Sequence, residues 1–175
     1  DVKNRCWADD ILKTFNINKD YLGEVVESCE PAGAVSKEAS LETGLVQGTV
    51  VAGGAGDQAA AAIGNGIIKE GIISCNIGTS GVVFAHTDQP KIDSEGRVHT
   101  FCHASKNAWH IMGVTQGAGL SMKWFKDNFY LGENENNYAF INKEIENVPI
   151  GSGGIYLPYL MGERTPHLDP HARGV

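Results

Sequence analysis

The sequence predicts an α/β fold divided into two domains. Segments with strand-like and helix-like patterns alternate along the 175 residues. The apolar content of 42% and the charged content of 20% are typical of a globular protein, and 22 glycines fit a chain with many turns. Short helices give way to strand pairs near residue 70, so a domain boundary is expected between residues 1–69 and residues 70–175.

The first of these domains is expected to be mostly helical. Asn18 and Ser36 are the polar residue types that begin helices, and Gly44 is the type that ends them. The apolar run at residues 49–52 predicts a short buried strand, and a helix rich in alanine follows it. The expected helices span residues 6–16, residues 19–26, the interval between Ser36 and Gly44, and residues 59–66.

The second domain is expected to begin with strand pairs and to continue with helices. Its last segment, residues 162–171, is rich in charge, proline and histidine, and its sequence fits a structured loop between domains or a plain surface turn. The expected strands are residues 72–77, 81–85, 98–102, 108–114 and 155–160. The expected helices are residues 117–130 and 135–147.

A glycine turn at residues 53–58 delivers one carboxylate, Asp57, between a strand and a helix. Glycine has no Cβ, so another molecule can approach such a backbone closely. A carboxylate at the exposed end of a strand is well placed to take a proton. Aspartate is also favoured as a helix N-cap for local reasons, and the local sequence supports the two roles about equally.

A second glycine turn, residues 77–81, carries hydroxyl groups, including that of Thr79. Backbone amides in such a turn can bind an anion. The four residues 78–81 also fit an ordinary hairpin turn that binds nothing. The chain has no P-loop pattern. Phosphate would therefore be held by amides, hydroxyls and a metal ion, and the two turns together suggest phosphate chemistry on a hydroxyl group.

Two other site classes are disfavoured. Residues 54–59 fit the glycine pattern of a dinucleotide-binding turn, but Asp57 would repel the pyrophosphate. Such a turn is also followed, about 20 residues later, by an acidic residue that binds the ribose, and this chain has none there. His99, Cys102 and His103 lack a fourth metal ligand at credible spacing, so an ordinary hairpin strand is favoured there.

Bulk properties narrow the partners and the compartment. The net charge of −7 argues against a nucleic-acid partner, and no apolar stretch has membrane length. The cysteines are far apart and form no paired motif, so reduced thiols and a cytoplasmic location are expected. They are Cys6, Cys29, Cys75 and Cys102.

The motifs together resemble the FGGY family of carbohydrate kinases, over essentially the whole chain. Members that phosphorylate D-xylulose resemble it most, a preference carried by Trp109 and residues 163–167. The similar segments are residues 50–59, 76–85, 98–103, 109–115, 157–167 and 169–174.

The resemblance implies an actin-like ATPase (ribonuclease H-like) fold. Residues 1–69 would be the C-terminal part of the sugar-binding domain, and residues 70–175 the N-terminal part of the ATP-binding domain. The implied substrates are a sugar and ATP, with Mg²⁺ as cofactor and a homodimer as one possible assembly. No metal ligand is assigned within this chain, because the family's metal contacts would lie outside it.

The resemblance also implies roles for individual residues. Asp57 would be the general base and Gln58 would hydrogen-bond the sugar. The ATP contacts would be Gly78, Thr79, Ser80, Gly119 and Lys123. Lys123 stands where the related glycerol kinases have glutamine.

Several segments of the family pattern are absent, including its Asp-x-Gly-Thr phosphate loop and its C-terminal adenine-binding segment. The chain is therefore expected to be a fragment that contains the base but has negligible activity alone. A sister kinase acting on gluconate, ribulose or glycerol, and a non-catalytic actin-like nucleotide-binding module, are the alternatives.

Overall fold

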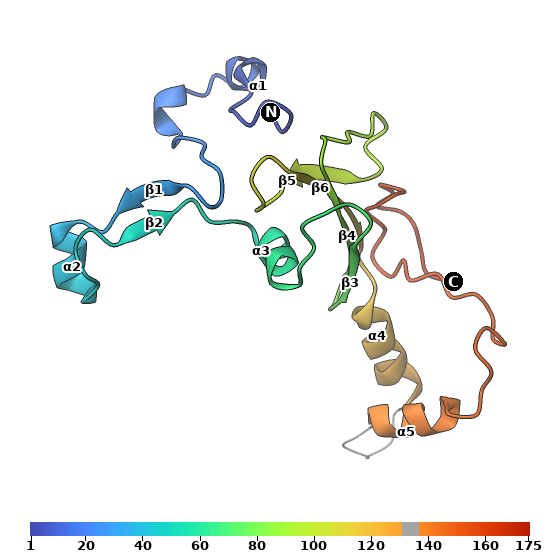
Figure 1. Ribbon diagram of the computed structural model, residues 1–175. Coiled ribbons are helices and arrows are strands. Elements are labelled where there is room, and N and C mark those ends of the chain that lie inside the picture. Colours follow the sequence, from blue (N-terminus) through green and yellow to red (C-terminus); the bar gives the residue numbers. More distant parts are fainter. Residues whose placement is uncertain (131–136) are drawn as a thin grey trace. The chain divides into compact units, whose positions relative to one another are not determined.

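The computed structural model describes residues 1–130 and 137–175, and it confirms an α/β fold with antiparallel sheets (Figure 1). The chain forms two compact units. Unit 1 contains residues 1–74, 84–94 and 99–112, and unit 2 contains residues 75–83, 95–98 and the described residues from 113 onward. Within the described residues, no helix is long and apolar enough to cross a membrane.

The helices of the structure are mostly shorter than the sequence predicts. The prediction for residues 19–26 reduces to a single 3-10 turn, and the positions expected at 135 and 136 lie outside the described residues. The helices are α1 (Asp9–Thr14), the 3-10 helix Lys19–Tyr21, α2 (Lys37–Thr43), α3 (Asp57–Gly64), α4 (Gly119–Phe129) and α5 (Asn137–Ile145).

The predicted helix ends are confirmed where local chemistry sets them. The Ser36 hydroxyl accepts a hydrogen bond from the Ala39 amide at 3.1 Å, which satisfies a free donor in the first turn of α2. Gly44 ends the same helix with φ +77°, in the left-handed region that favours glycine. The side chain of Asn18 accepts from the Asp20 amide at 3.0 Å.

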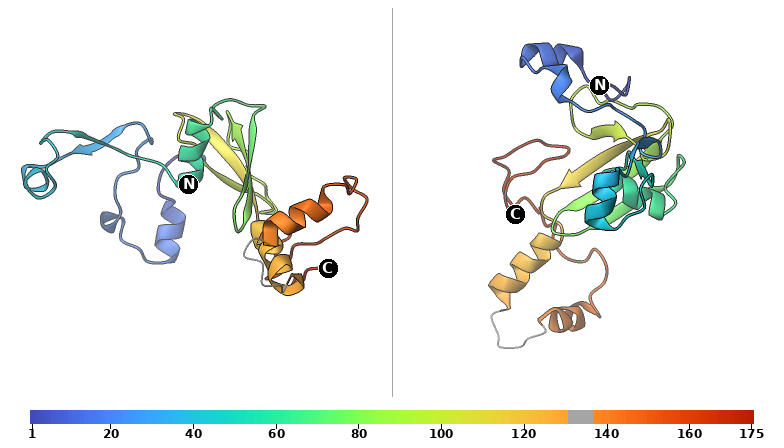
Figure 2. Two further views of the ribbon diagram at one scale, coloured as in Figure 1. Left: turned by 90° about the horizontal axis from the view of Figure 1, so that it is seen from below. Right: turned by 90° about the vertical axis from the view of Figure 1, so that its left-hand side faces the viewer.

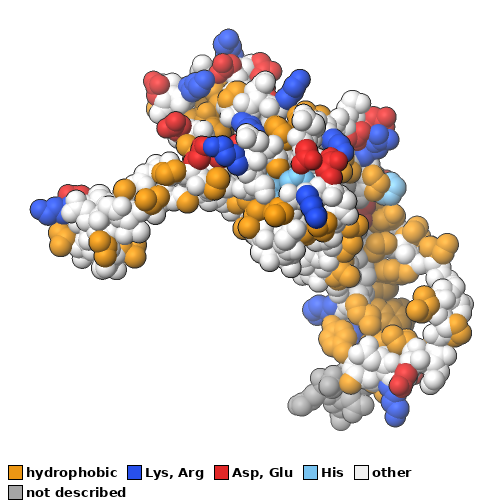
Figure 3. All heavy atoms as spheres, in the orientation of Figure 1, with side chains coloured by type: hydrophobic (Ala, Val, Ile, Leu, Met, Phe, Trp, Pro, Cys, Tyr) orange, Lys and Arg blue, Asp and Glu red, His pale blue; other side chains and the backbone are white. Residues whose placement is uncertain are grey.

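A two-stranded antiparallel ribbon of β1 (Pro31–Ala34) and β2 (Val50–Ala52) precedes α3. β1 was not predicted from the sequence. The expectation that residues 49–52 form a buried strand was also wrong, because β2 is exposed throughout. In the described part of the chain these two strands form a sheet by themselves, and every residue of both strands is exposed. Hydrophobic side chains accordingly lie exposed along the ribbon and α2 (Figure 3). Val50 is 64% exposed and Leu41 80% exposed.

The four-stranded sheet has the strand order β3-β4-β6-β5. The predicted hairpin is confirmed, with His99 opposite Met112 and Cys102 opposite Trp109. The strands are β3 (Ile73–Ile77), β4 (Gly81–Thr87), β5 (His99–Cys102) and β6 (Trp109–Thr115).

The strand predicted at residues 155–160 is absent from the structure. Its backbone makes an isolated bridge from Leu160 to Gly162. The Leu157 amide instead donates to the Val175 carbonyl at 2.8 Å, and Pro158 has no N–H to give a sheet.

The core of unit 1 lies between α3 and β4, which run alongside each other (Figure 1, Figure 2). Ala62, Ile67 and Phe84 are buried together, with Ile72 against them. One face of the alanine-rich helix packs against this core, because Ala59 is only 7% exposed and Ala62 only 2% exposed. Small side chains let the helix approach the strand closely.

Histidine rings extend this core. His86, His103 and His110 are 4%, 1% and 4% exposed, and His110 stacks on Phe84 with 4.3 Å between ring centroids. Burial lowers the pKa of His110 from 6.5 to about 4, with a smaller contribution from His103. Burial, and then the neighbouring His86, lower the pKa of His103. The imidazoles of His103 and His110 are therefore neutral in the folded chain at pH 7.

We expect unit 1 to lose stability in mild acid. In the unfolded chain His110 gains a proton as the pH falls through about 6.5, while in the folded chain it does so only near 4. The stabilisation is therefore complete above about pH 6.5 and falls between pH 6.5 and 4, by about 2 kcal/mol at pH 5. Urea unfolding at pH 7.5 and pH 5 measures the loss. His110→Phe should remove most of it, changing the exposed His171 should not, and equal midpoints at both pH values would contradict the expectation.

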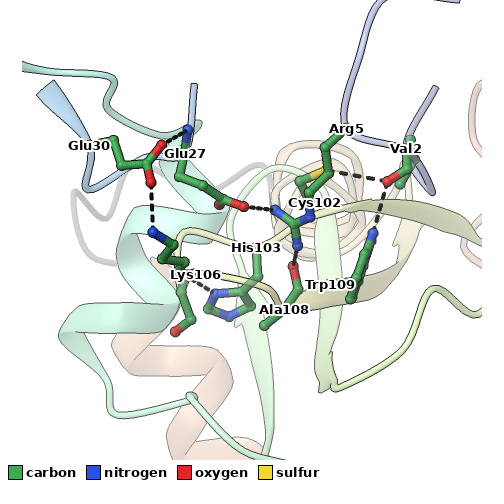
Figure 4. A network of polar contacts seen from close by, with 10 residues as sticks. Val2, Arg5, Glu27, Glu30, Cys102, His103, Lys106, Ala108 and Trp109 are labelled. Atoms are coloured by element: carbon green, nitrogen blue, oxygen red, sulfur yellow. Dashed lines mark hydrogen bonds and ion pairs between the residues drawn. The ribbon is translucent and has the colours of Figure 1, made fainter. Parts of the chain in front are cut away.

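A polar network fixes the N-terminal segment to the tip of the β5–β6 hairpin (Figure 4). The Arg5 guanidinium donates to Glu27 at 2.7 Å and to the Ala108 carbonyl at 2.5 Å, and it lies 4.3 Å from the centre of the Trp109 ring. The Trp109 indole donates to the Val2 carbonyl at 2.9 Å. The hairpin is therefore held by residues about 100 positions earlier in the chain.

Candidate functional site

The carboxylate of Asp57 stands exposed at the start of α3. Gly56 is the N-cap residue and Asp57 is the first helical residue, so the N-cap alternative is wrong. The Asp57 Oδ1 atom accepts a hydrogen bond from the Gln58 amide at 2.8 Å. This bond orients the carboxylate and uses one of the free donors of the first turn.

The glycines before Asp57 serve the backbone of the turn. Gly54 has φ +75°, a conformation that few other residues adopt. A Cβ on Gly53 would lie 2.7 Å from the Glu27 carbonyl oxygen, so this glycine lets another stretch of the same chain approach closely. The backbone geometry therefore explains why glycine occupies positions 53 and 54, without any contact to a ligand.

A cavity of about 320 Å³ opens at the start of α3, inside unit 1. Its helix wall includes Asp57 and Gln58, and the β5–β6 hairpin forms the opposite wall. The hairpin residues that line it are Phe101, Cys102, His110 and Met112. The cavity combines one carboxylate and one amide with apolar and aromatic surface, the usual composition of a small-molecule site.

The second glycine turn is in unit 2, where it caps the start of α4. The Gly78 carbonyl accepts from the Gly119 amide at 2.8 Å, and the Thr79 carbonyl accepts from the amides of Ala118 and Leu120 at 3.1 Å. These bonds satisfy the free donors at the helix start. In the described part of the chain, no backbone carbonyl accepts from the amides of Thr79 and Ser80, so those donors are available to an anion.

Gly119 is required by this contact. A Cβ at that position would lie 2.5 Å from the Gly78 carbonyl oxygen and 3.3 Å from its carbon. The structure thus brings Gly78, Thr79 and Gly119 together. Lys123 lies one turn further along α4, where its ammonium pairs with Asp127 at 2.5 Å in an exposed position. The hydrogen bond between Lys123 and Asp127 lowers the pKa of Asp127 and raises the pKa of Lys123.

The loop at residues 162–171 is structured and belongs to unit 2. Glu163, which is 4% exposed, accepts from the Thr115 hydroxyl at 2.6 Å and from the Gln116 amide at 3.0 Å. The Thr165 hydroxyl donates to the Val114 carbonyl at 2.8 Å. The loop therefore fixes the end of β6 just before α4 begins, and the plain surface turn is wrong.

The hairpin wall of the Asp57 cavity was not predicted from the sequence. His110 and Met112 alternate along β6 and so lie on the same face of the strand, a signal that the sequence contains. Nothing in the sequence says that this face meets the start of α3. His99, Cys102 and His103 do not converge as ligands, since His103 Nδ1 accepts from the Ser105 amide at 2.8 Å. Among the described residues, no group of three or more His, Cys, Asp and Glu could hold a metal ion.

The chain is similar to known proteins over nearly its whole length. The model of the N-terminal domain of the FGGY family of carbohydrate kinases matches residues 1–64, and the model of its C-terminal domain matches residues 73–175. A xylulose kinase of Bacillus subtilis (strain 168) is 40% identical over 99% of this chain. The chain spans about a third of the length of that relative, 34%.

The chain also superposes on solved structures of kinases over nearly its whole length. A "xyloylose kinase" from Brucella ovis superposes with a TM-score of 0.88 at 34% identity, over 99% of this chain and 35% of the other. A gluconate kinase from Lactobacillus acidophilus superposes with a TM-score of 0.86 at 28% identity, over 100% of this chain and 35% of the other.

Proposed function

Because the chain belongs to the FGGY family of carbohydrate kinases, whose members have the actin-like ATPase fold, we propose that it is the central part of an ATP-dependent sugar kinase. We further propose D-xylulose as the sugar and D-xylulose 5-phosphate as the product. The observation that carries the proposal is the exposed Asp57 carboxylate beside Gln58 in a cavity of sugar size. The xylulose kinase similarity over 99% of the chain supports the choice of sugar.

In the proposed reaction Asp57 is the general base. Its carboxylate takes the proton from a sugar hydroxyl as the hydroxyl oxygen forms a bond to the γ-phosphorus of ATP, and the bond from that phosphorus to ADP breaks. The Gln58 side chain hydrogen-bonds the sugar and holds the hydroxyl in place. An exposed carboxylate that is held by the backbone amide of Gln58 suits this role.

The ATP side of the reaction is assigned to unit 2. The amides of Thr79 and Ser80 and the Thr79 hydroxyl would hold the terminal phosphates, with Gly78 shaping the turn. Gly119 would allow the turn and α4 to meet. Lys123 would contribute positive charge near the nucleotide, although its ion pair with Asp127 must open for direct contact.

Magnesium is the cofactor expected of such a kinase. The described residues do not fit a protein-held magnesium cage, because no group of three or more of them could hold a metal ion. Magnesium is commonly held by substrate phosphates and one or two carboxylates. When bound it neutralises charge on the transferring phosphate.

In this proposal Asp57 and Gln58, from residues 1–69, contact the sugar, and the ATP contacts come from residues 70–175. Since the chain spans 34% of its relative, we propose that these 175 residues alone have negligible kinase activity. Phosphorylation of D-xylulose by the isolated chain would contradict this.

A panel of sugars with ATP, assayed on the complete kinase, tests the function. D-xylulose is expected to give the highest kcat/KM, because a site built to bind each hydroxyl rejects analogues by large factors. Gluconate is the second candidate, supported by the gluconate kinase structure of similar fold. A preference for gluconate, ribulose or glycerol would change the sugar but keep the reaction. No phosphorylation of any of them would reject the kinase proposal.

A further inference from the structure

The hairpin wall of the Asp57 cavity contains a buried polar atom with no protein partner. His110 lines the cavity and is 4% exposed, yet among the described residues nothing hydrogen-bonds its Nδ1 atom. Leaving a buried polar atom unpaired is costly. Its ring is fixed, because it stacks on Phe84 at 4.3 Å between centroids, so the ring cannot easily turn to find a partner.

The rest of that wall suits a small ligand with both polar and apolar surface. Phe101 and Met112 supply aromatic and flexible apolar contacts, and Asp57 and Gln58 face them from α3. The volume of about 320 Å³ is at the lower end of the range of about 300–1,000 Å³ for ligand pockets. A monosaccharide therefore fits the cavity better than a nucleotide does.

We propose that His110 is a sugar-binding residue, whose Nδ1 hydrogen-bonds a hydroxyl of the polyol while Phe101 and Met112 pack against its carbon chain. This inference rests on the proposed function and adds the β5–β6 hairpin to its sugar site. The low pKa of His110, about 4 because of burial, keeps the ring neutral. A neutral ring nitrogen can donate to or accept from a hydroxyl, according to the tautomer.

Substitution of His110 in the complete kinase is the first test. His110→Phe keeps an aromatic ring against Phe84 and removes the ring nitrogens. We expect the KM for the sugar to rise about tenfold, the worth of one hydrogen bond left unmade, while the KM for ATP stays the same. His110→Asn places a polar atom near the Nδ1 position and should restore much of the sugar affinity.

His103→Phe is the matched control. His103 is also buried in the same hairpin, with an unpaired ring nitrogen, but it does not line this cavity. The control should lower stability without raising the KM for the sugar. An equal rise in both variants would mean that the core, rather than the sugar contact, had changed, and would overturn the proposal.

Sugar analogues that each lack one hydroxyl identify the contact. If His110 binds one hydroxyl, the wild type binds the analogue that lacks this hydroxyl more weakly than it binds the sugar. His110→Phe should bind that analogue almost as well as it binds the sugar. The two penalties then fail to add, as expected for groups in contact. Penalties that add for every hydroxyl would overturn the proposal. A wild type inactive on every sugar would instead reject the kinase function, so the two failures are distinguishable.

A measurement without substitution covers the case in which His110→Phe does not fold. In kinase labelled with ¹⁵N-histidine, saturating sugar should shift the Nδ1 resonance of His110, whereas ATP alone should not. An unchanged His110 resonance at saturating sugar would overturn the proposal.

Discussion

Replacing Asp57 by asparagine is expected to lower the kcat of the complete kinase by a factor of about 10²–10⁴, the usual contribution of a general base. Asparagine keeps an oxygen that can accept from the Gln58 amide, as the Asp57 Oδ1 does at 2.8 Å. The start of α3 should therefore keep its geometry. Steady-state kinetics gives kcat, and calorimetric titration gives the Kd values for sugar and ATP, which should be nearly unchanged.

Asp10→Asn is the control for this substitution. Asp10 is also an exposed aspartate in the first turn of a helix, α1. It is not part of the Asp57 cavity, so its variant should keep the wild-type kcat. A wild-type kcat for Asp57→Asn would contradict the base role. It would favour the alternative class, a non-catalytic nucleotide-binding module of the actin-like superfamily, because such a module needs no base.

The elements that the sequence predicted correctly are those that short stretches of chain determine. The capping of α2 depends on Ser36 and Gly44, each acting within one helical turn. The β5–β6 hairpin depends on the alternating patterns of two neighbouring strands and on a short tip between them. Both can be read from the sequence because the residues that interact are close together in it.

The elements that were missed depend on distant partners. Residues 31–34 read Pro-Ala-Gly-Ala, with no β-branched side chain, and become a strand only by pairing with β2. Residues 155–160 have strand-like composition, but Leu157 pairs with Val175. Propensity could not anticipate either outcome, because the deciding contact lies elsewhere in the chain.

The candidate site divides in the same way. Asp57 and the turn at residues 78–81 were found from their local motifs. The contact between Glu163 and Thr115 joins residues 48 positions apart, and no local pattern indicates it. The family resemblance predicted Gly119 as an ATP contact, and the structure adds that the approach of Gly78 leaves no room for a side chain there.

The close approach of Gly78 makes Gly119→Ala a damaging change in unit 2. The added methyl carbon would lie 2.5 Å from the Gly78 carbonyl oxygen. The clash is with backbone, which cannot turn aside as a flexible side chain does, so α4 and the turn must separate. Overpacking of this kind and the loss of the hydrogen bonds between them should lower the free energy of unfolding by about 2–4 kcal/mol.

The same separation should damage nucleotide binding in the complete kinase. The carbonyls of Gly78 and Thr79 hold the turn against α4, and we propose that the amides of the same turn bind phosphate. The KM for ATP should therefore rise about tenfold or more, while the Kd for the sugar changes little, since Asp57 and Gln58 lie in unit 1.

Gly64→Ala is the matched control, because a Cβ on that helical glycine meets nothing within 4 Å. It should leave both constants unchanged and stabilise α3 by about 0.5–1 kcal/mol. If Gly119→Ala bound ATP as well as Gly64→Ala does, the turn at residues 78–81 would not be the phosphate site.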